Sequence, residues 1–119
     1  MANYKIISDD NKIVEGKTVY RIEDVDSGEL GGYIEKEFNL SQTGDCFIYG
    51  DSIVYGDAQV TDNAKIYGVV KDYAVVKGEA EVYGVVKENA VVEGQVKVYG
   101  VVGGNAHLSG SEVIYGNID

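Results

Sequence analysis

Small, variable and aliphatic positions follow one another in a fixed order along most of the chain. The pattern is clearest between Ile53 and Gly116, where it forms four 16-residue rows: IVYGDAQVTDNAKIYG, VVKDYAVVKGEAEVYG, VVKENAVVEGQVKVYG and VVGGNAHLSGSEVIYG. Every row ends in Tyr-Gly. So short a period indicates a solenoid, in which each repeat forms one coil and neighbouring coils bury each other's faces.

Within each row, the unit small–any–aliphatic predicts short strands. Ala58-Gln59-Val60 and Ala64-Lys65-Ile66 begin six residues apart, and later units are spaced by four, six and six residues. Because successive side chains on a strand point to opposite faces, the small and aliphatic residues point inward and the middle residue points outward. Three such sides predict a triangular tube of 16–18 residues per coil. Gly68 and its equivalents occupy the tight corner.

Residues 1–34 do not follow the repeat and predict an N-terminal β cap on a solenoid that spans 35–119. The turn-rich run Asp9–Lys12 favours a hairpin that joins a strand at Asn3–Ser8 to Ile13-Val14. A bare solenoid end exposes strand edges, so a cap over the first coil is expected. The expected fold is an all-β, single-stranded parallel β-helix of about five coils with this short cap.

One outward side of the predicted tube is aliphatic in every coil, with a tyrosine at the adjoining corner. Monomers rarely expose a contiguous apolar patch of this kind, so we expect it to contact another copy or a different protein. The alternative is purely structural, because valine suits strands wherever it points and tyrosines can stack between coils. The predicted face comprises Tyr49, Ile53, Tyr67, Val69, Tyr83, Val85, Tyr99, Val101 and Tyr115.

The net charge of −10 argues against direct binding of nucleic acid. Acidic residues recur at the predicted corners of the tube. They either keep the protein soluble or form a surface that competes for the basic groove of another protein. Lysines between these acidic residues reduce the negative charge along the corners. The acidic positions are Asp45, Asp51, Asp57, Asp62, Asp72, Glu79, Glu88 and Glu93.

The sequence predicts a cytoplasmic protein without a membrane span. It holds no run of 18 apolar residues, and its first residues lack the apolar core of a signal peptide. The one cysteine, Cys46, excludes an internal disulfide and fits a reducing compartment. It occupies an inward small position, so we expect a buried structural thiol rather than a nucleophile.

Candidate chemistry is sparse. The single histidine, His107, falls on an outward column of the last coil, and no orienting partner or substrate pocket is evident beside it. The aspartates recur at turns, where aspartate is common, and no calcium-loop or phosphate-binding glycine motif is present. We expect no metal, no cofactor and no catalytic residue.

The small–x–aliphatic hexapeptides resemble the hexapeptide-repeat family, whose fold is the left-handed parallel β-helix. Residues 30–68 also resemble an uncharacterised subgroup of small bacterial and phage proteins. In that subgroup, elements matching Gly31-Gly32-Tyr33-Ile34-Glu35 and Asn39-Leu40-Ser41 precede the repeats. The resemblance covers about residues 28–116 and implies left-handedness. Enzymes of the wider family are acyltransferases, typically trimers with a catalytic histidine between subunits.

These observations favour a non-catalytic interaction module that self-associates as a dimer or trimer and binds a protein partner. One concrete version is a phage-type inhibitor that occupies the basic groove of a host nucleic-acid-binding defence protein by acidic mimicry. The alternatives are an acyltransferase-like enzyme that uses His107 and a purely structural, self-assembling solenoid.

Overall fold

The computed structural model describes residues 3–119 and is all-β apart from one 3-10 turn. Three longer strands come first, and they are followed by the 3-10 helix and by two-residue strands, one on each side of each coil. The bounds are β1 (Tyr4–Val14), β2 (Lys17–Asp24), β3 (Leu30–Ile34), η1 (Glu37–Asn39), β4 (Phe47–Ile48), β5 (Ile53–Val54), β6 (Gln59–Val60), β7 (Lys65–Ile66), β8 (Val69–Val70), β9 (Val75–Val76), β10 (Glu81–Val82), β11 (Val85–Val86), β12 (Val91–Val92), β13 (Lys97–Val98), β14 (Val101–Val102), β15 (His107–Leu108), β16 (Val113–Ile114) and β17 (Asn117–Ile118).

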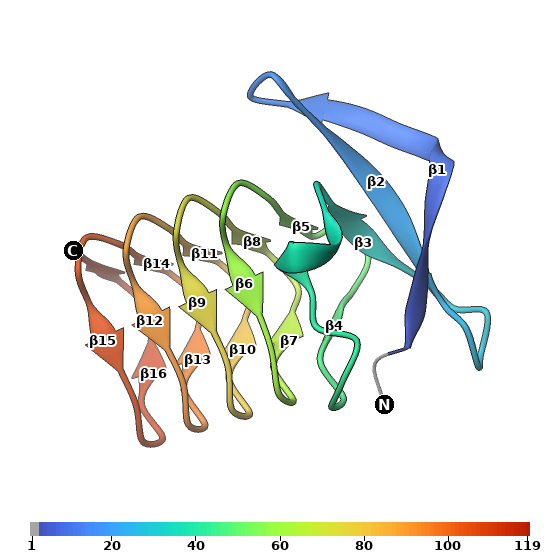
Figure 1. Ribbon diagram of the computed structural model, residues 1–119. Helices are drawn as coiled ribbons and strands as arrows, with labels where there is room; N and C mark the ends of the chain where they lie inside the picture. Colours follow the sequence, from blue (N-terminus) through green and yellow to red (C-terminus); the bar gives the residue numbers. More distant parts are fainter. Residues whose placement is uncertain (1–2) are drawn as a thin grey trace.

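The strands stack into a β-solenoid of about five turns, as predicted (Figure 1). Sheet A has the order β1-β2-β3-β5-β8-β11-β14-β17, sheet B the order β15-β12-β9-β6, and sheet C the order β16-β13-β10-β7-β4. From β3 onward the neighbouring strands of all three sheets are parallel. The three-sided tube predicted from the hexapeptide pattern is therefore confirmed, while its handedness stays a prediction.

The coils shorten along the chain before they become regular. Tyr33 on β3 pairs with Ile53, 20 positions later, and Phe47 on β4 pairs with Lys65, 18 positions later. From β5 onward the step is 16 residues, as in the pairing of Ile53 with Val69. Gly68 shows why the short corner needs glycine, because a Cβ there would overlap the backbone carbonyl of Gly84 in the next coil.

The core is a narrow column of the inward small and aliphatic residues. The alanines at 58, 74 and 90 have no exposed surface, and neither do the valines at 60, 76 and 92. The last coil is more open, because Leu108 and Ile114 are only half-buried and Glu112 is exposed. Among residues 3–119, no helix is long and apolar enough to span a membrane.

The N-terminal strands extend sheet A beyond the first coil. β1 and β2 form an antiparallel hairpin, β2 pairs antiparallel with β3, and β3 pairs parallel with β5. The expected turn at Asp9–Lys12 is wrong, because β1 continues through it with a register shift between Ile7 and Asn11. The turn lies instead at Glu15-Gly16, where both residues have positive φ, as two-residue hairpin turns of type I′ require.

Candidate interaction surfaces

Five tyrosines form a continuous stack along the corner between sheets C and A. We call this stack the tyrosine ladder; it comprises Tyr49, Tyr67, Tyr83, Tyr99 and Tyr115. Successive ring centroids lie 4.7–5.3 Å apart, with planes inclined by 4° to 13°. This distance matches the separation of neighbouring strands, so each coil adds one ring to the stack.

The ladder is open to solvent beyond its first ring. Tyr67, Tyr83 and Tyr99 are 41%, 38% and 45% exposed, and Tyr115 at the open end is 77% exposed. Tyr49 is half-buried and meets Phe47 edge-on, with ring centroids 5.1 Å apart. Each exposed ring therefore adds apolar edge and a phenolic hydroxyl to the surface at the spacing of the coils.

The rings lean toward sheet C rather than sheet A. The Tyr83 hydroxyl donates a hydrogen bond of 2.7 Å to Glu81, whose side chain points outward from β10. This bond to a carboxylate, together with partial burial, raises the pKa of Tyr83 to about 12. The hydroxyl is consequently a hydrogen-bond donor at neutral pH.

The aliphatic column of the predicted face lies on sheet A, and the hairpin covers part of it. Val19 is fully buried and clusters with Tyr33 and Tyr55, and the half-buried Ile53 and Val69 pack against this cluster. Val85 and Val101 lie beyond this cluster and are half-buried. The structure thus divides the predicted face into an exposed ladder that leans toward sheet C and an aliphatic column that is covered at its N-terminal end.

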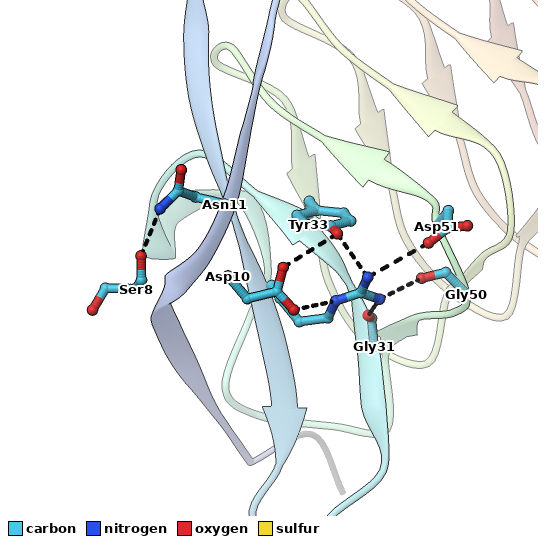
Figure 2. A network of polar contacts seen from close by, with 8 residues as sticks. Ser8, Asp10, Asn11, Gly31, Tyr33, Gly50 and Asp51 are labelled. Carbon is cyan, nitrogen blue, oxygen red and sulfur yellow. Dashed lines mark hydrogen bonds and ion pairs between the residues drawn. The ribbon is translucent and has the colours of Figure 1, made fainter.

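The only arginine, Arg21, ties the hairpin to the first coil (Figure 2). Arg21 pairs with Tyr33 across β2 and β3, and its guanidinium carbon lies 4.4 Å from the centroid of that ring. Its nitrogens donate to Asp10, to the Tyr33 hydroxyl and to the carbonyl of Gly31, at 3.1, 2.6 and 2.9 Å. The sequence showed no sign of this network, because its members come from three separate segments.

A second contact fastens the turn of the hairpin to the solenoid. The Tyr55 hydroxyl donates a short hydrogen bond to the Glu15 carboxylate, and Lys71 lies 3.6 Å from the same carboxylate. The hydrogen bond from Tyr55, followed by the charge of Lys71, lowers the pKa of Glu15 below its usual value. Burial of Tyr55, followed by this hydrogen bond, raises the pKa of its phenol.

Three of the predicted acidic corner residues bind the backbone of the next coil. Asp62, Asp72 and Glu88 all have positive φ. Their carboxylates accept hydrogen bonds from backbone N–H groups of the coil that follows, at 3.0, 3.0 and 2.6 Å. Aspartate tolerates this left-handed geometry better than most residues. These acids therefore have a structural role at the corners.

The other acidic positions also have partners within the chain. Asp57 binds Lys36 at 2.9 Å, and Asp51 lies 3.6 Å from Arg21. Glu79 accepts a hydrogen bond from Gln95 at 3.1 Å, and Asp45 also has an interaction within the chain. Glu93 binds His107 and lies 4.0 Å from Lys77. Each of these acidic side chains therefore has a contact within the fold.

The structure places Cys46 in the core and His107 on the surface beside Glu93, a partner that the sequence did not show. Cys46 is fully buried, and burial raises the pKa of its thiol to about 11, which keeps it protonated at neutral pH. His107 is exposed on β15 and pairs with Glu93. Within residues 3–119, no three His, Cys, Asp or Glu side chains gather closely enough to hold a metal ion.

Asn39 is a buried polar residue whose hydrogen bonds the repeat pattern did not indicate. Its side-chain oxygen accepts hydrogen bonds from the N–H groups of Glu35 and Lys36, at 3.1 and 3.0 Å. Its amide nitrogen donates to the carbonyls of Gly56 and Ala58, at 3.2 and 2.8 Å. The side chain uses all four of its hydrogen-bonding positions. It holds the irregular segment before β4 against the first regular coil.

In comparisons with known proteins, no family model, no curated protein and no solved structure matches this chain.

Proposed function

We propose that the protein is a non-catalytic interaction module of the cytosol, which self-associates as a dimer or trimer and binds a protein partner. The observation that carries the proposal is the exposure of the tyrosine ladder beyond Tyr49. Its rings are held in register by a core that is fully buried in the regular coils. Tyrosine is enriched at interfaces because it combines a large apolar ring with a hydroxyl and loses little conformational entropy.

Rigidity supports this proposal independently of composition. The three inner ladder rings stack on a ring on either side, so their rotamers are constrained before any partner arrives. A surface whose side chains are already ordered loses little conformational entropy on binding. Val85 and Val101, half-buried on sheet A, would extend the contact around the corner.

The test is the solution mass by light scattering after size exclusion, for the wild type and for Tyr83→Ser/Tyr99→Ser. The expected result is an oligomeric wild type and a folded, monomeric variant. The matched control is Tyr73→Ser, because Tyr73 is 65% exposed but lies outside the ladder. This control should keep the wild-type mass. Circular dichroism establishes that all three proteins are folded.

A monomeric wild type at the highest concentration studied would refute self-association. Loss of the oligomer in the Tyr73→Ser control as well would place the interface elsewhere. An oligomer that persists in the double variant would also contradict a role for the ladder.

The partner class that we favour is a basic nucleic-acid-binding protein, with the phage-type inhibitor suggested by the subgroup resemblance as its concrete form. The acidic residues that would act in mimicry have hydrogen bonds or ion pairs within the chain. The ladder is consequently the stronger basis for binding. A complex formed by charge mimicry should weaken steeply with added salt, whereas one formed through the ladder should not.

A further inference from the structure

The two ends of the solenoid differ in how they are covered. At the N-terminal end the hairpin closes the tube, and its Tyr4 and Ile22 belong to the buried core. At the other end, β15, β16 and β17 are the last strands of sheets B, C and A (Figure 1). Among residues 3–119, no strand pairs with the outer edges of these three strands. Unpaired edges of this kind readily accept a strand from another chain.

We call the surface formed by these three outer edges the terminal face, and the core is open there as well. In the regular coils the inward valines are fully buried, whereas Leu108, Ile114 and Ile118 are only half-buried. These three side chains lie on β15, β16 and β17. Repeat proteins ordinarily cover such an end with a capping repeat that has a polar outer face. The terminal face instead exposes apolar side chains and strand edges together.

The last coil lacks most of the charges that the earlier coils carry. Rows 53–68, 69–84 and 85–100 hold three, five and four acidic or basic side chains, whereas row 101–116 holds one carboxylate, Glu112, and no lysine. Natural edge strands use charges, lysine above all, to prevent pairing with other chains. The charged positions Lys87, Glu88, Glu93 and Lys97 correspond to Gly103, Gly104, Ser109 and Val113 in the last coil. Repulsion between two acidic copies is therefore smallest at this end.

The shape of the terminal face selects a second copy of the same face. The chain climbs along the tube as it winds, so β15 lies lowest, β16 next and β17 highest at this end. Two such faces can meet about a two-fold axis when β16 pairs with the other copy's β16, and β15 pairs with the other copy's β17. The lowest edge then meets the highest, so all three gaps are equal. A single extended peptide would satisfy only one of the three edges.

We propose that two copies associate end to end through the terminal face, with three antiparallel strand pairs across a two-fold axis. The two solenoids then share one continuous core, which covers Leu108, Ile114 and Ile118. β16 crosses the axis, so Val113, which points outward from β16, lies close to the other copy's Val113. The contact goes beyond the proposed function, because it does not need the tyrosine ladder.

Two features of the terminal face keep this contact weak. Glu112 stands at the inward position that Val96 fills in the preceding coil, and its carboxylate would lose water in the joined core. A row of 16 residues forms the face, fewer than the roughly 20–30 residues a side of a standard interface. We expect a dissociation constant between about 0.1 and 1 mM. Size exclusion dilutes the protein below this range, so the light-scattering test of the ladder is independent of the terminal face.

The experiment measures translational diffusion and ¹⁵N amide shifts by NMR between about 0.05 and 2 mM protein. It uses Tyr83→Ser/Tyr99→Ser, which removes the ladder contact, and the wild type in parallel. Diffusion of the ladder variant should slow toward that of a dimer as the concentration rises. In both proteins, concentration-dependent shifts in this range should be confined to the last coil and to β17. A wild type without ladder association would refute the proposed function but leave this result unchanged.

Two substitutions made in the ladder variant test the interface in opposite directions. Glu112→Val should tighten the association about tenfold, because it removes a carboxylate from the joined core and restores the residue type of the preceding coil. Val113→Lys/Asn117→Lys should abolish the association, because it returns lysine to two edges and brings like charges together at the axis. All of these side chains are exposed, so the variants should fold.

The matched control is Gln59→Lys/Tyr73→Lys, which adds the same charge to outward positions of the earlier coils. It should associate like the ladder variant that carries it. Diffusion and shifts that do not change up to about 2 mM protein would overturn the inference. Equal weakening by the two pairs of lysines, or an association that Glu112→Val leaves unchanged, would overturn it as well.

Discussion

The regular coils and the N-terminal hairpin share sheet A, yet different interactions hold them in place. In the coils, each inward position repeats, and the backbone bonds repeat with it, as in the 2.9 Å bonds from Val69 to Gly84 and from Val85 to Gly100. The hairpin has no such repetition. It docks through the pairing of β2 with β3, through the buried Val19 and Ile22, and through individual polar contacts of Arg21 and Glu15. Repeated backbone fit therefore holds the coils together, whereas the hairpin depends on contacts that each occur once.

Tyr4 illustrates the hairpin's dependence on single residues. Its hydroxyl donates to the Leu40 carbonyl at 2.6 Å, and its backbone exchanges hydrogen bonds of 2.9 and 3.0 Å with the Gln42 side chain. Burial, reinforced by the charge of Glu37, raises the pKa of this phenol. β1 is thereby fixed at its beginning to the segment that follows η1.

The largest expected effect is that of Gly84→Ala in a regular coil. A Cβ at Gly84 would lie far inside contact distance of the Gly100 carbonyl, which the backbone cannot vacate without breaking the corner. We expect a loss of about 3 kcal/mol or more in the free energy of unfolding, measured by urea denaturation.

Gly116→Ala is the matched control for that substitution. Gly116 occupies the same repeat position in the last coil, and nothing lies within 4 Å of a Cβ built there. The Gly116→Ala substitution should leave the urea concentration at the midpoint of unfolding nearly unchanged. Equal losses for the two variants would show that the coils do not depend on close corner packing.

Asn39→Ala should have the next largest effect, because it removes a fully buried side chain that bridges the irregular segment and the first regular coil. Three backbone groups lose their partner and the Glu35 N–H keeps only its 3.3 Å bond to the Val54 carbonyl, so we expect a loss of about 3 kcal/mol in unfolding free energy. The control Asn105→Ala lies at an exposed corner and should cost less than about 0.5 kcal/mol. A small effect at Asn39 would mean that water replaces its hydrogen bonds.

Arg21→Met should separate the two regions, since it removes the contacts of the guanidinium but keeps much of the apolar stem. The amides of β1 should exchange with solvent faster, reflecting a loss of about 2 kcal/mol in the local opening free energy. Amides of β10 to β13 should keep their protection. The control Lys5→Met removes only an exposed pair with Glu23, so it should change little. Equal acceleration in both regions would instead indicate one cooperative unit.

The smallest effect should come from pH, through Glu15 at the turn of the hairpin. Its folded pKa is lowered by the Tyr55 hydrogen bond, by Lys71 and by the nearby Lys17. A lowered carboxyl pKa contributes stability that is present above the unfolded value and is lost as the pH falls. The protection factors of the hairpin amides, which are corrected for the intrinsic exchange rate, should therefore fall as the pH drops below the ordinary value of 4.5 toward the lowered folded pKa. In Glu15→Gln this pH dependence should be reduced; an unchanged profile would assign it to other groups.

The hexapeptide pattern was sufficient to predict the coils because each coil packs the same inward positions against the same positions of its neighbours. Ala58 and Val60 point inward for the same reason as Ala74 and Val76, and one register explains all of them. The hairpin turn could not be predicted in this way. Turn-forming residues occur both at Asp9–Lys12 and at Glu15-Gly16, and local preference does not choose between them.

The predicted contact face, formed by the tyrosine ladder and the aliphatic column, also combines features that the repeat predicts with features that depend on distant contacts. Its tyrosines are one coil apart in the sequence, so their stacking follows from the period. The direction in which the rings lean depends on Glu81 and Phe47, and the covering of Ile53 depends on the folded-back hairpin. The repeat pattern indicates neither the direction of the rings nor the covering of Ile53.

The sequence by itself determined the three-sided tube, its inward columns and the glycine corners, because period and side-chain size act between neighbours that are always one coil apart. Tertiary structure alone decided where the hairpin lies, which part of the aliphatic column stays open, and which way the tyrosine rings lean. Those outcomes depend on contacts such as Arg21 with Gly31 and Asp10, which form once in the molecule and between segments whose separation follows no period.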